Sequence, residues 1–267
     1  MNHQTILNKA QKIAILSALQ AGAQLKKMFV TPGRIKFSLK SKHQVVTAAD
    51  ITAEKIILNQ IKKNFSTHDI LSEEVGFIDF TSTDYLWIVD PLDGTTNFTM
   101  KNPIFSTAIA LAYKGEVVLG VIFAPLLNEL YVARRSQGAY LNGKKIKVSA
   151  VRDLAKGFHT YCYGTKKNVS GGRAVRYYRK MFMQGNEIRQ LGAATIECAR
   201  VAQGITESIV IPGVHAWDVA AGALLIREAG GKVTDFKNQP WTLQSKDIVA
   251  TNGLVHQKLL QIIHGSK

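Results

Sequence analysis

Cysteine is scarce in this sequence. The 267 residues include two cysteines, Cys162 and Cys198, which lie far apart and form no CxxC or cysteine–histidine pattern. This excludes a small domain held together by disulfides and gives no support for a structural zinc site. The simplest interpretation is two packed thiols in a reducing compartment. We therefore expect a cytoplasmic protein.

A long apolar run is also missing. Residues 6–29 have the apolar spacing of one helix face, but lysines interrupt it at Lys9, Lys12, Lys26 and Lys27. The segment lacks the order of charged, apolar and small residues that marks a signal peptide. No stretch reaches the roughly 18 uncharged apolar residues that a membrane-spanning helix needs. We expect an N-terminal amphipathic helix and no membrane segment.

Acidic residues are few. The chain has 19 Asp and Glu against 34 Lys and Arg, which gives a net charge of +15. Such a surface attracts small anionic substrates, and it also suits an RNA or acidic protein partner. No basic motif with interleaved aromatic residues favours the second interpretation. Since 46% of the residues are hydrophobic, the chain is globular and long enough to bury a large core.

The first part of the chain has the pattern of a mixed α+β structure. Residues 51–61 form an amphipathic run, so Asp50 is expected at or just inside a helix start. Residues 69–72 read as a short strand that ends at Glu73 and Glu74. Residues 85–89 form a continuous apolar run of strand length, which stops at Asp90. A buried strand is therefore expected to deliver carboxylates at its C-terminal end.

The rest of the chain changes character near residue 150. Residues 105–149 alternate apolar runs with short turns, which predicts an antiparallel sheet. The last third alternates strand and helix signals, with helices expected over 193–202 and 219–229 and Asp218 as the N-cap of the second. We expect one compact unit with a soft boundary, an α+β part over 1–150 and an α/β part over 151–267 that supplies Asp218.

Six acidic residues lie at the ends of these predicted elements. They are Asp50, Glu73, Glu74, Asp90, Asp93 and Asp218. Carboxylates that converge on one point stay ionised at neutral pH only when cations join them, and Mg²⁺ prefers a few such oxygens together with water and phosphate. The pattern favours metal-assisted phosphoryl chemistry. The alternative is ordinary, because Asp90 and Asp93 also suit an Asp-Pro turn and Glu73 and Glu74 suit a charged surface.

Twelve consecutive residues, Trp87 to Phe98 (WIVDPLDGTTNF), closely resemble the signature of the inositol monophosphatase family. A second similar motif spans 215–222 (HAWDVAAG) and is followed by Glu228-Ala229-Gly230-Gly231. Shorter matches occur at 46–50, at 72–74 and at 192–194, in the family's order. The resemblance implies a layered αβαβα sandwich of the inositol monophosphatase and fructose bisphosphatase type, a lithium-sensitive phosphatase activity and a homodimer.

The resemblance also implies roles for individual residues. Two or three Mg²⁺ ions are expected on Glu73, Asp90, the carbonyl of Leu92, Asp93 and Asp218. Asp50, Glu73 and Thr95 are expected to be catalytic, with Asp50 and Thr95 orienting and deprotonating the attacking water. Substrate is expected to contact Asp93, Gly94, Thr95, Ala194 and Asp218. Glu74 and Lys40 are expected to support the site from behind the ligands. His215 is expected to be structural, because Mg²⁺ prefers oxygen donors.

Two positions depart from the family's pattern. Where many inositol phosphatases carry a glutamate that binds substrate hydroxyls, this chain has Ile211, and where an acid is common it has Gln44. The first expected substrate is inositol monophosphate or a related sugar or polyol phosphate. The loss of the glutamate keeps histidinol phosphate, 3′-phosphoadenosine 5′-phosphate and fructose 1,6-bisphosphate open. An interaction protein that binds RNA or protein and a purely structural metal module are the alternatives from other classes.

Overall fold

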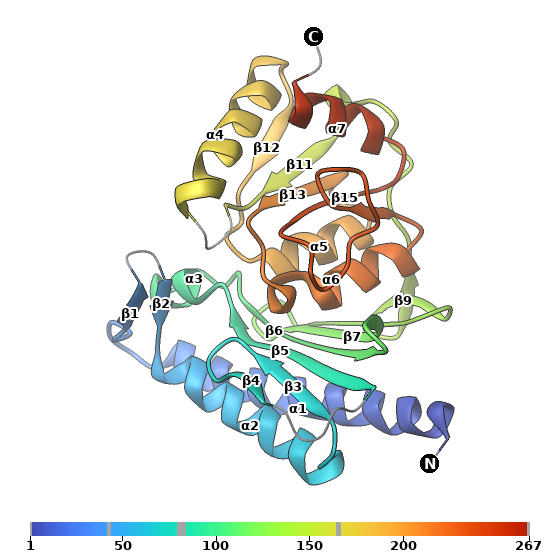
Figure 1. Ribbon diagram of the computed structural model, residues 1–267. Coiled ribbons are helices and arrows are strands. Elements are labelled where there is room, and N and C mark those ends of the chain that lie inside the picture. The colour runs from blue at the N-terminus through green and yellow to red at the C-terminus, as the bar shows by residue number, and fades with distance from the viewer. Residues whose placement is uncertain (1, 42–43, 79–83, 164–166, 266–267) are drawn as a thin grey trace.

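The computed structural model describes residues 2–41, 44–78, 84–163 and 167–265. Two β-sheets and three helical layers alternate in the order helix, sheet, helix, sheet, helix (Figure 1). Helices α1 and α2 cover the outer face of the larger sheet, α5 and α6 lie between the sheets, and α4 and α7 cover the outer face of the smaller sheet (Figure 1). The expected layered αβαβα sandwich is confirmed.

Eight strands form the larger sheet in the order β10-β9-β8-β7-β6-β5-β3-β4. All neighbours are antiparallel except β3 and β5. The strands are β3 (Asp69–Ser72), β4 (Gly76–Ile78), β5 (Tyr85–Asp93), β6 (Ser106–Tyr113), β7 (Glu116–Ala124), β8 (Glu129–Arg134), β9 (Gly138–Leu141) and β10 (Lys144–Ile146). The expected antiparallel meander over 105–149 is therefore correct.

Five strands form the smaller sheet in the order β12-β11-β13-β15-β14. Parallel pairing joins β12, β11 and β13, and antiparallel pairing joins the rest. The strands are β11 (Phe158–Tyr161), β12 (Glu187–Arg189), β13 (Ser208–Pro212), β14 (Lys232–Thr234) and β15 (Asp247–Thr251). A separate hairpin pairs β1 (Ser38–Ser41) with β2 (Gln44–Val46).

Seven α-helices and one 3₁₀ turn are present in the described part of the chain. They are α1 (His3–Val30), α2 (Ala48–Asn64), α3 (Thr95–Thr99), α4 (Lys167–Met183), α5 (Ala194–Ala202), α6 (Ala216–Glu228), α7 (His256–His264) and η1 (Leu154–Lys156). No helix in these ranges is long and apolar enough to cross a membrane.

Strand β5 is buried on both faces, which explains its continuous apolar run. Trp87 and Val89 belong to the core beneath α1 and α2, whereas Ile88 belongs to the core around α5 and α6. Helix α6 lies close against the larger sheet, because a Cβ at Gly120 of β7 would stand 2.8 Å from the carbonyl oxygen of Ala221. The strand that carries the family signature is therefore fixed between two packed layers.

The structure corrects two predicted boundaries. Helix α6 begins at Ala216, so Asp218 is its third residue and His215 is the N-cap. The prediction of Asp218 as the N-cap was wrong, because the N–H of His215 donates back to Asp218 Oδ2 at 2.8 Å and extends the helix start. Strand β5 also continues to Asp93 instead of stopping at Val89.

The division of the chain near residue 150 stays a prediction. The larger sheet ends at Ile146 and the smaller sheet begins at Phe158.

Candidate active site

A cavity of about 500 Å³ opens where the C-terminal end of β5 meets the N-terminal ends of α5 and α6. Four acidic residues line it, and they come from segments far apart in the sequence: Glu73, Asp90, Asp93 and Asp218. The predicted residues Leu92, Gly94, Thr95 and Ala194 line it as well. The fold thus brings most of the predicted site residues to one place.

Asp90 and Asp93 reach the cavity because the β5–β6 ladder is irregular. Pairing with β6 is regular through Asp90 and resumes at Asp93, with a register shift between them. The N–H of Leu92 donates to Asp90 Oδ1 at 3.1 Å, and the hydroxyl of Thr107 donates to the carbonyl of Pro91 at 3.0 Å. Such a bulge re-aims side chains at the end of a strand, so both carboxylates can face the same cavity.

The N-terminus of α5 holds Asp93. The N–H groups of Ala194 and Thr195 donate to its carboxylate at 3.2 and 2.8 Å, and the Thr195 hydroxyl donates to Oδ2 at 2.5 Å. Unpaired N–H groups and the helix dipole favour a negative charge at this position. Thr195 was not predicted from the sequence, although it directly follows the small-residue motif that contains Ala194.

Glu73 lies in the turn after β3, and a buried glutamate of α2 holds that turn. Glu54 is 3% exposed. Its Oε1 accepts from the Ser72 hydroxyl at 2.5 Å and from the N–H groups of Glu74 and Val75 at 3.2 and 3.3 Å. Sequence reasoning missed Glu54. The available signal was its spacing, because it follows Asp50 by one helical turn and so lies on the same helix face.

Asp50 lies behind Thr95 and is fully buried. Its Oδ2 accepts from the N–H and the hydroxyl of Thr47, both at 2.7 Å, so it closes a capping box at the start of α2. Its Oδ1 lies 2.8 Å from the Thr95 hydroxyl, which can also donate to the carbonyl of Leu92 at 3.0 Å. Burial raises the pKa of Asp50. The arrangement joins a carboxylate of raised basicity to a hydroxyl at the cavity wall.

Gly94 has a left-handed backbone, with φ of 86°, and precedes the short helix α3. A Cβ there would stand 2.9 Å from the carbonyl oxygen of Ile104, so the position accepts glycine alone without strain. The close approach of the backbone to the cavity is therefore present at Gly94, and its contact with substrate stays a prediction.

The four carboxylates destabilise one another as anions. Burial, followed by the charges of Glu73, Asp93 and Asp218, raises the pKa of Asp90 well above its usual range. Burial raises the pKa of Asp218 well above its usual range and that of Asp93 to about 6. Asp90 also shares a hydrogen bond with Glu73. Protons or cations must therefore compensate this charge.

The donor set fits a hard divalent cation, because it consists of carboxylate oxygens with a backbone carbonyl beside them. Among the described residues, no three acidic, histidine or cysteine side chains are already spaced as a complete metal shell. The carboxylates would therefore draw together around an ion.

His215 stacks on Trp217, with ring centroids 4.4 Å apart, which agrees with a structural role.

Two residues were predicted to support the site from behind the ligands, Glu74 and Lys40, and these roles stay predictions. The Lys40 side chain lies outside the described residues, as does that of Gln44. Glu74 is half-buried, and its N–H donates to Glu54, but it is absent from the described lining of the cavity. The position of Glu74 thus supports the turn that presents Glu73, and its side chain is not placed in the cavity.

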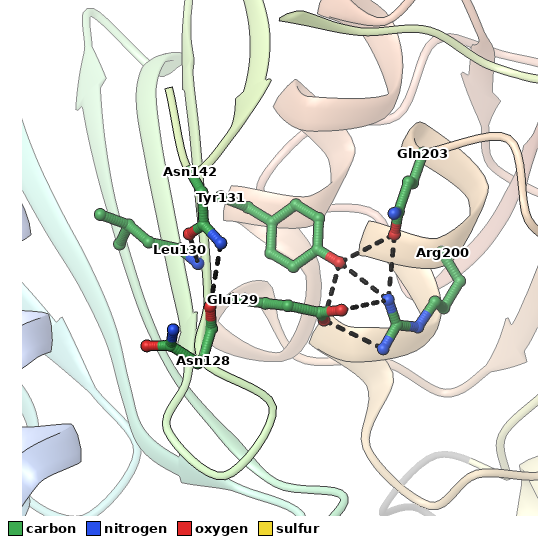
Figure 2. A network of polar contacts seen from close by, with 7 residues as sticks. All are labelled: Asn128, Glu129, Leu130, Tyr131, Asn142, Arg200 and Gln203. Atoms are coloured by element: carbon green, nitrogen blue, oxygen red, sulfur yellow. Dashed lines mark hydrogen bonds and ion pairs between the residues drawn. The ribbon is translucent and has the colours of Figure 1, made fainter. Parts of the chain in front are cut away.

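A polar network fixes α5, whose N-terminus holds Asp93, against the larger sheet (Figure 2). Arg200 forms a two-pronged ion pair with Glu129 of β8, with N–O distances of 3.0 Å. Arg200 also donates to the Tyr131 hydroxyl at 2.9 Å and to Gln203 Oε1 at 3.0 Å. Both charged side chains are mostly buried, at 15% and 20% exposure. A planar guanidinium paired in this way gives directional as well as energetic stabilisation.

The lining of the cavity also includes Ile211 on β13, which is 2% exposed. Beside it, the Cys162 thiol donates to Glu197 Oε1 at 3.2 Å. The same oxygen accepts from the N–H groups of Leu191 and Gly192 at 2.9 and 3.0 Å. Burial raises the pKa of Glu197 to about 7. Glu197 thus orders the 190–192 loop that lines the cavity, a role that sequence reasoning did not find.

A layered αβαβα sandwich with a carboxylate cavity at the junction of its sheets defines a class of metal-dependent phosphatases. The profile of the inositol monophosphatase family matches residues 6–267. The chain belongs to the inositol monophosphatase family, and it is a phosphatase by that membership.

Named relatives and solved structures agree with this assignment. The chain is 36% identical to the Nus factor SuhB of Escherichia coli K12 over 248 residues, which cover 93% of both chains. It is 33% identical to an inositol-1-monophosphatase of Mesorhizobium japonicum over 263 residues, 94% of both chains. The crystal structure of the extragenic suppressor protein SuhB from Bartonella henselae matches with a TM-score of 0.91 and 33% identity, covering 97% of this chain and all of the other.

Proposed function

We propose that this protein is a Mg²⁺-dependent phosphomonoesterase that hydrolyses a small phosphorylated metabolite in the cytoplasm. The observation that carries the proposal is the convergence of Glu73, Asp90, Asp93 and Asp218 on one cavity, where burial raises the pKa values of the three aspartates and the neighbouring carboxylates add to the rise for Asp90 and Asp218. Buried carboxylates without a counter-charge do not stabilise a purely structural protein, whereas metal-assisted phosphoryl transfer needs such carboxylates to hold its metal ions. The first expected substrate is inositol monophosphate or a related sugar or polyol phosphate.

The residues present would hold two or three ions on Glu73, Asp90, the Leu92 carbonyl, Asp93 and Asp218. Bound Mg²⁺ would neutralise phosphate charge and acidify the attacking water. Thr95 would orient that water through its hydroxyl, because Asp50 Oδ1 accepts the Thr95 proton at 2.8 Å and leaves the oxygen's lone pairs toward the cavity. Asp50 would take the released proton through Thr95, and its raised pKa suits a base. Gly94 and Ala194 would line the phosphate.

The direct test is phosphate release with Mg²⁺ across inositol 1-phosphate, histidinol phosphate, 3′-phosphoadenosine 5′-phosphate and fructose 1,6-bisphosphate. We expect hydrolysis of at least one of them, with loss of activity in EDTA and inhibition by Li⁺. Absence of release from all four at millimolar substrate would contradict the proposal. Release that persists in EDTA would contradict the metal-dependent mechanism.

Metal binding should stabilise the fold more at high pH. Asp93 has a folded-state pKa of about 6, above its unfolded value near 4. Between these values the folded state holds more protons, so the stability of the metal-free protein falls as pH rises through this window and stays low above it. Mg²⁺ binds the ionised carboxylates and removes this penalty. We expect Mg²⁺ to raise Tm by about 5 °C or more at pH 8 and by clearly less at pH 5.

Differential scanning fluorimetry with EDTA-treated protein measures this difference. Asp93→Asn is the matched control, since it should reduce the Mg²⁺ effect at pH 8. An equal rise in Tm at both pH values would show that the ion binds away from these carboxylates.

A second candidate function is binding of RNA or an acidic protein. It is favoured by the net charge of +15 and by the relative named as a Nus factor at 36% identity. Such binding would weaken steeply with salt, because phosphate contacts release counterions. A gel shift with a single-stranded RNA at two salt concentrations tests it. Binding that survives Asp93→Asn would make the two functions separable, and no shift at low salt would contradict RNA binding.

We also propose that the protein forms a homodimer through α4. Val175, Phe182 and Met183 are 68%, 62% and 74% exposed on this helix. Tyr178 stacks on Phe182 with ring centroids 6.0 Å apart, which makes a continuous apolar surface. Exposed apolar clusters of this kind mark association surfaces.

Light scattering should give twice the mass of 29.4 kDa, and Phe182→Asp should shift the protein toward the monomer. A monomeric wild type would contradict the proposal.

A further inference from the structure

A second cavity, of about 680 Å³, lies at the other end of α6 from the active site. It forms where the β6–β7 turn, the last turn of α6, β14 and the following 238–243 loop meet. Asp218 in the first turn of α6 lines the active site, and Arg227 in the last turn lines this second cavity. The helical rise between them is about 14 Å. The second cavity is therefore a separate place on the molecule.

The charged side chains around this cavity differ in whether they already have a partner. Three cations line it, Arg135, Arg227 and Lys232, together with two carboxylates. Glu116 is paired with Arg135. Glu228 accepts from the N–H groups of Ser136 and Gly138, both at 2.8 Å. Both carboxylates therefore already have donors of their own.

Arg227 is an exposed cation in the lining of this cavity. Its Nη2 donates to the carbonyl of Trp241 at 2.7 Å, and it forms no ion pair with any residue in the described ranges. A guanidinium stays protonated in proteins and offers five N–H donors. An anion in the cavity can therefore pair with Arg227 in place of water.

The wall of the cavity is apolar. Leu224 and Val233 line it beside Trp241, which is 3% exposed. The indole Nε1 of Trp241 is buried and has no hydrogen-bond partner among the residues that the structure describes. Because less than 1 Å² of this atom is accessible, a molecule in the cavity would contact the indole ring and not Nε1.

We propose that this cavity binds a small amphipathic anion, with a flat apolar body against Trp241 and Leu224 and a carboxylate, sulfonate or phosphate group on Arg227 and Lys232. The site is independent of the phosphatase chemistry, because none of its residues lines the catalytic cavity. The combination of an apolar wall and basic residues favours an amphipathic anion over inorganic phosphate or a neutral aromatic.

The test uses the three tryptophans of the chain as reporters. Naphthalene-2-sulfonate is titrated into ¹⁵N-labelled full-length protein, and the three indole N–H signals are followed by NMR, with Trp241→Phe identifying one of them. We expect the Trp241 signal to shift saturably. Trp217, next to Asp218, and Trp87, whose Nε1 donates to His68 at 3.2 Å, should stay in place.

Substitutions that remove one positive charge distinguish a specific anion site from non-specific binding to an apolar surface. Arg227→Gln should weaken the titration tenfold or more, and Lys232→Gln, a change at an exposed residue, should weaken it severalfold without risk to the fold. Arg176→Gln, at an exposed arginine of α4, is the matched control and should change nothing. An unmoved Trp241 signal would overturn the proposal. Equal affinity in wild type, Arg227→Gln and Lys232→Gln would overturn it as well.

Discussion

Replacing Asp93 by asparagine should lower kcat by about three orders of magnitude while the fold is kept. The carboxylate is one of four that face the catalytic cavity, and its position is fixed by three donors from Ala194 and Thr195. Losing this anion removes several kcal/mol of metal-mediated charge stabilisation, and each 1.36 kcal/mol is a factor of ten in rate. Single-turnover phosphate release at saturating Mg²⁺ measures the effect.

The stability of this variant should not fall. Because burial raises the pKa of Asp93 to about 6, its ionised form opposes folding at neutral pH when no metal is present. The asparagine side chain is neutral and of nearly the same shape. Its amide oxygen can keep both Thr195 donors, and only the long bond from the Ala194 N–H at 3.2 Å is lost, so metal-free Asp93→Asn should melt at or above the temperature of the wild type. Asp84→Asn, at an exposed aspartate paired with Lys114 at 3.7 Å, is the matched control and should keep full activity. Near-normal turnover in Asp93→Asn would contradict the assignment of the site.

The sequence was most informative where function restricts many neighbouring residues at once. The run from Trp87 to Phe98 led to the fold, to the strand that carries it and to Asp90 and Asp93. Glu73 and Asp218 could be placed beside them because short motifs occur in the same order along the chain. The proposed roles of these residues remain predictions, whereas their common position in one cavity is a structural finding.

The residues that sequence reasoning missed act through backbone groups. Glu54 holds the turn of Glu73 by accepting two backbone N–H bonds, and Glu197 holds the 190–192 loop in the same way. The spacing of Glu54 from Asp50 places it on the same helix face, but no sequence pattern shows which turn or loop its carboxylate meets, because that depends on how distant elements pack. The capping box of α6 was misassigned for a related reason, since a carboxylate three residues inside a helix resembles an N-cap in sequence.

Ile211→Glu should increase the preference for inositol 1-phosphate over less hydroxylated phosphate esters by tenfold or more. Ile211 lies on β13 and lines the catalytic cavity at 2% exposure, so a substrate that carries several hydroxyls meets an apolar surface there. Such hydroxyls lose their hydrogen bonds to water without replacement. A carboxylate at this position can accept them, and a hydrogen bond to a charged group contributes about 1.5–3 kcal/mol.

The quantity to measure is the ratio of kcat/KM for inositol 1-phosphate to that for histidinol phosphate, in the wild type and in each variant. Ile211→Leu is the matched control, because it keeps an apolar wall of the same volume and should leave the ratio unchanged. Ile211→Gln should give an intermediate gain, since it accepts hydroxyls without a charge. Glutamate replaces a buried isoleucine here, so a lower Tm is expected, and the ratio of two substrates on one preparation is insensitive to the folded fraction. An unchanged ratio in Ile211→Glu would show that the hydroxyl-bearing part of the substrate does not contact β13, and specificity would then have to come from other walls of the cavity.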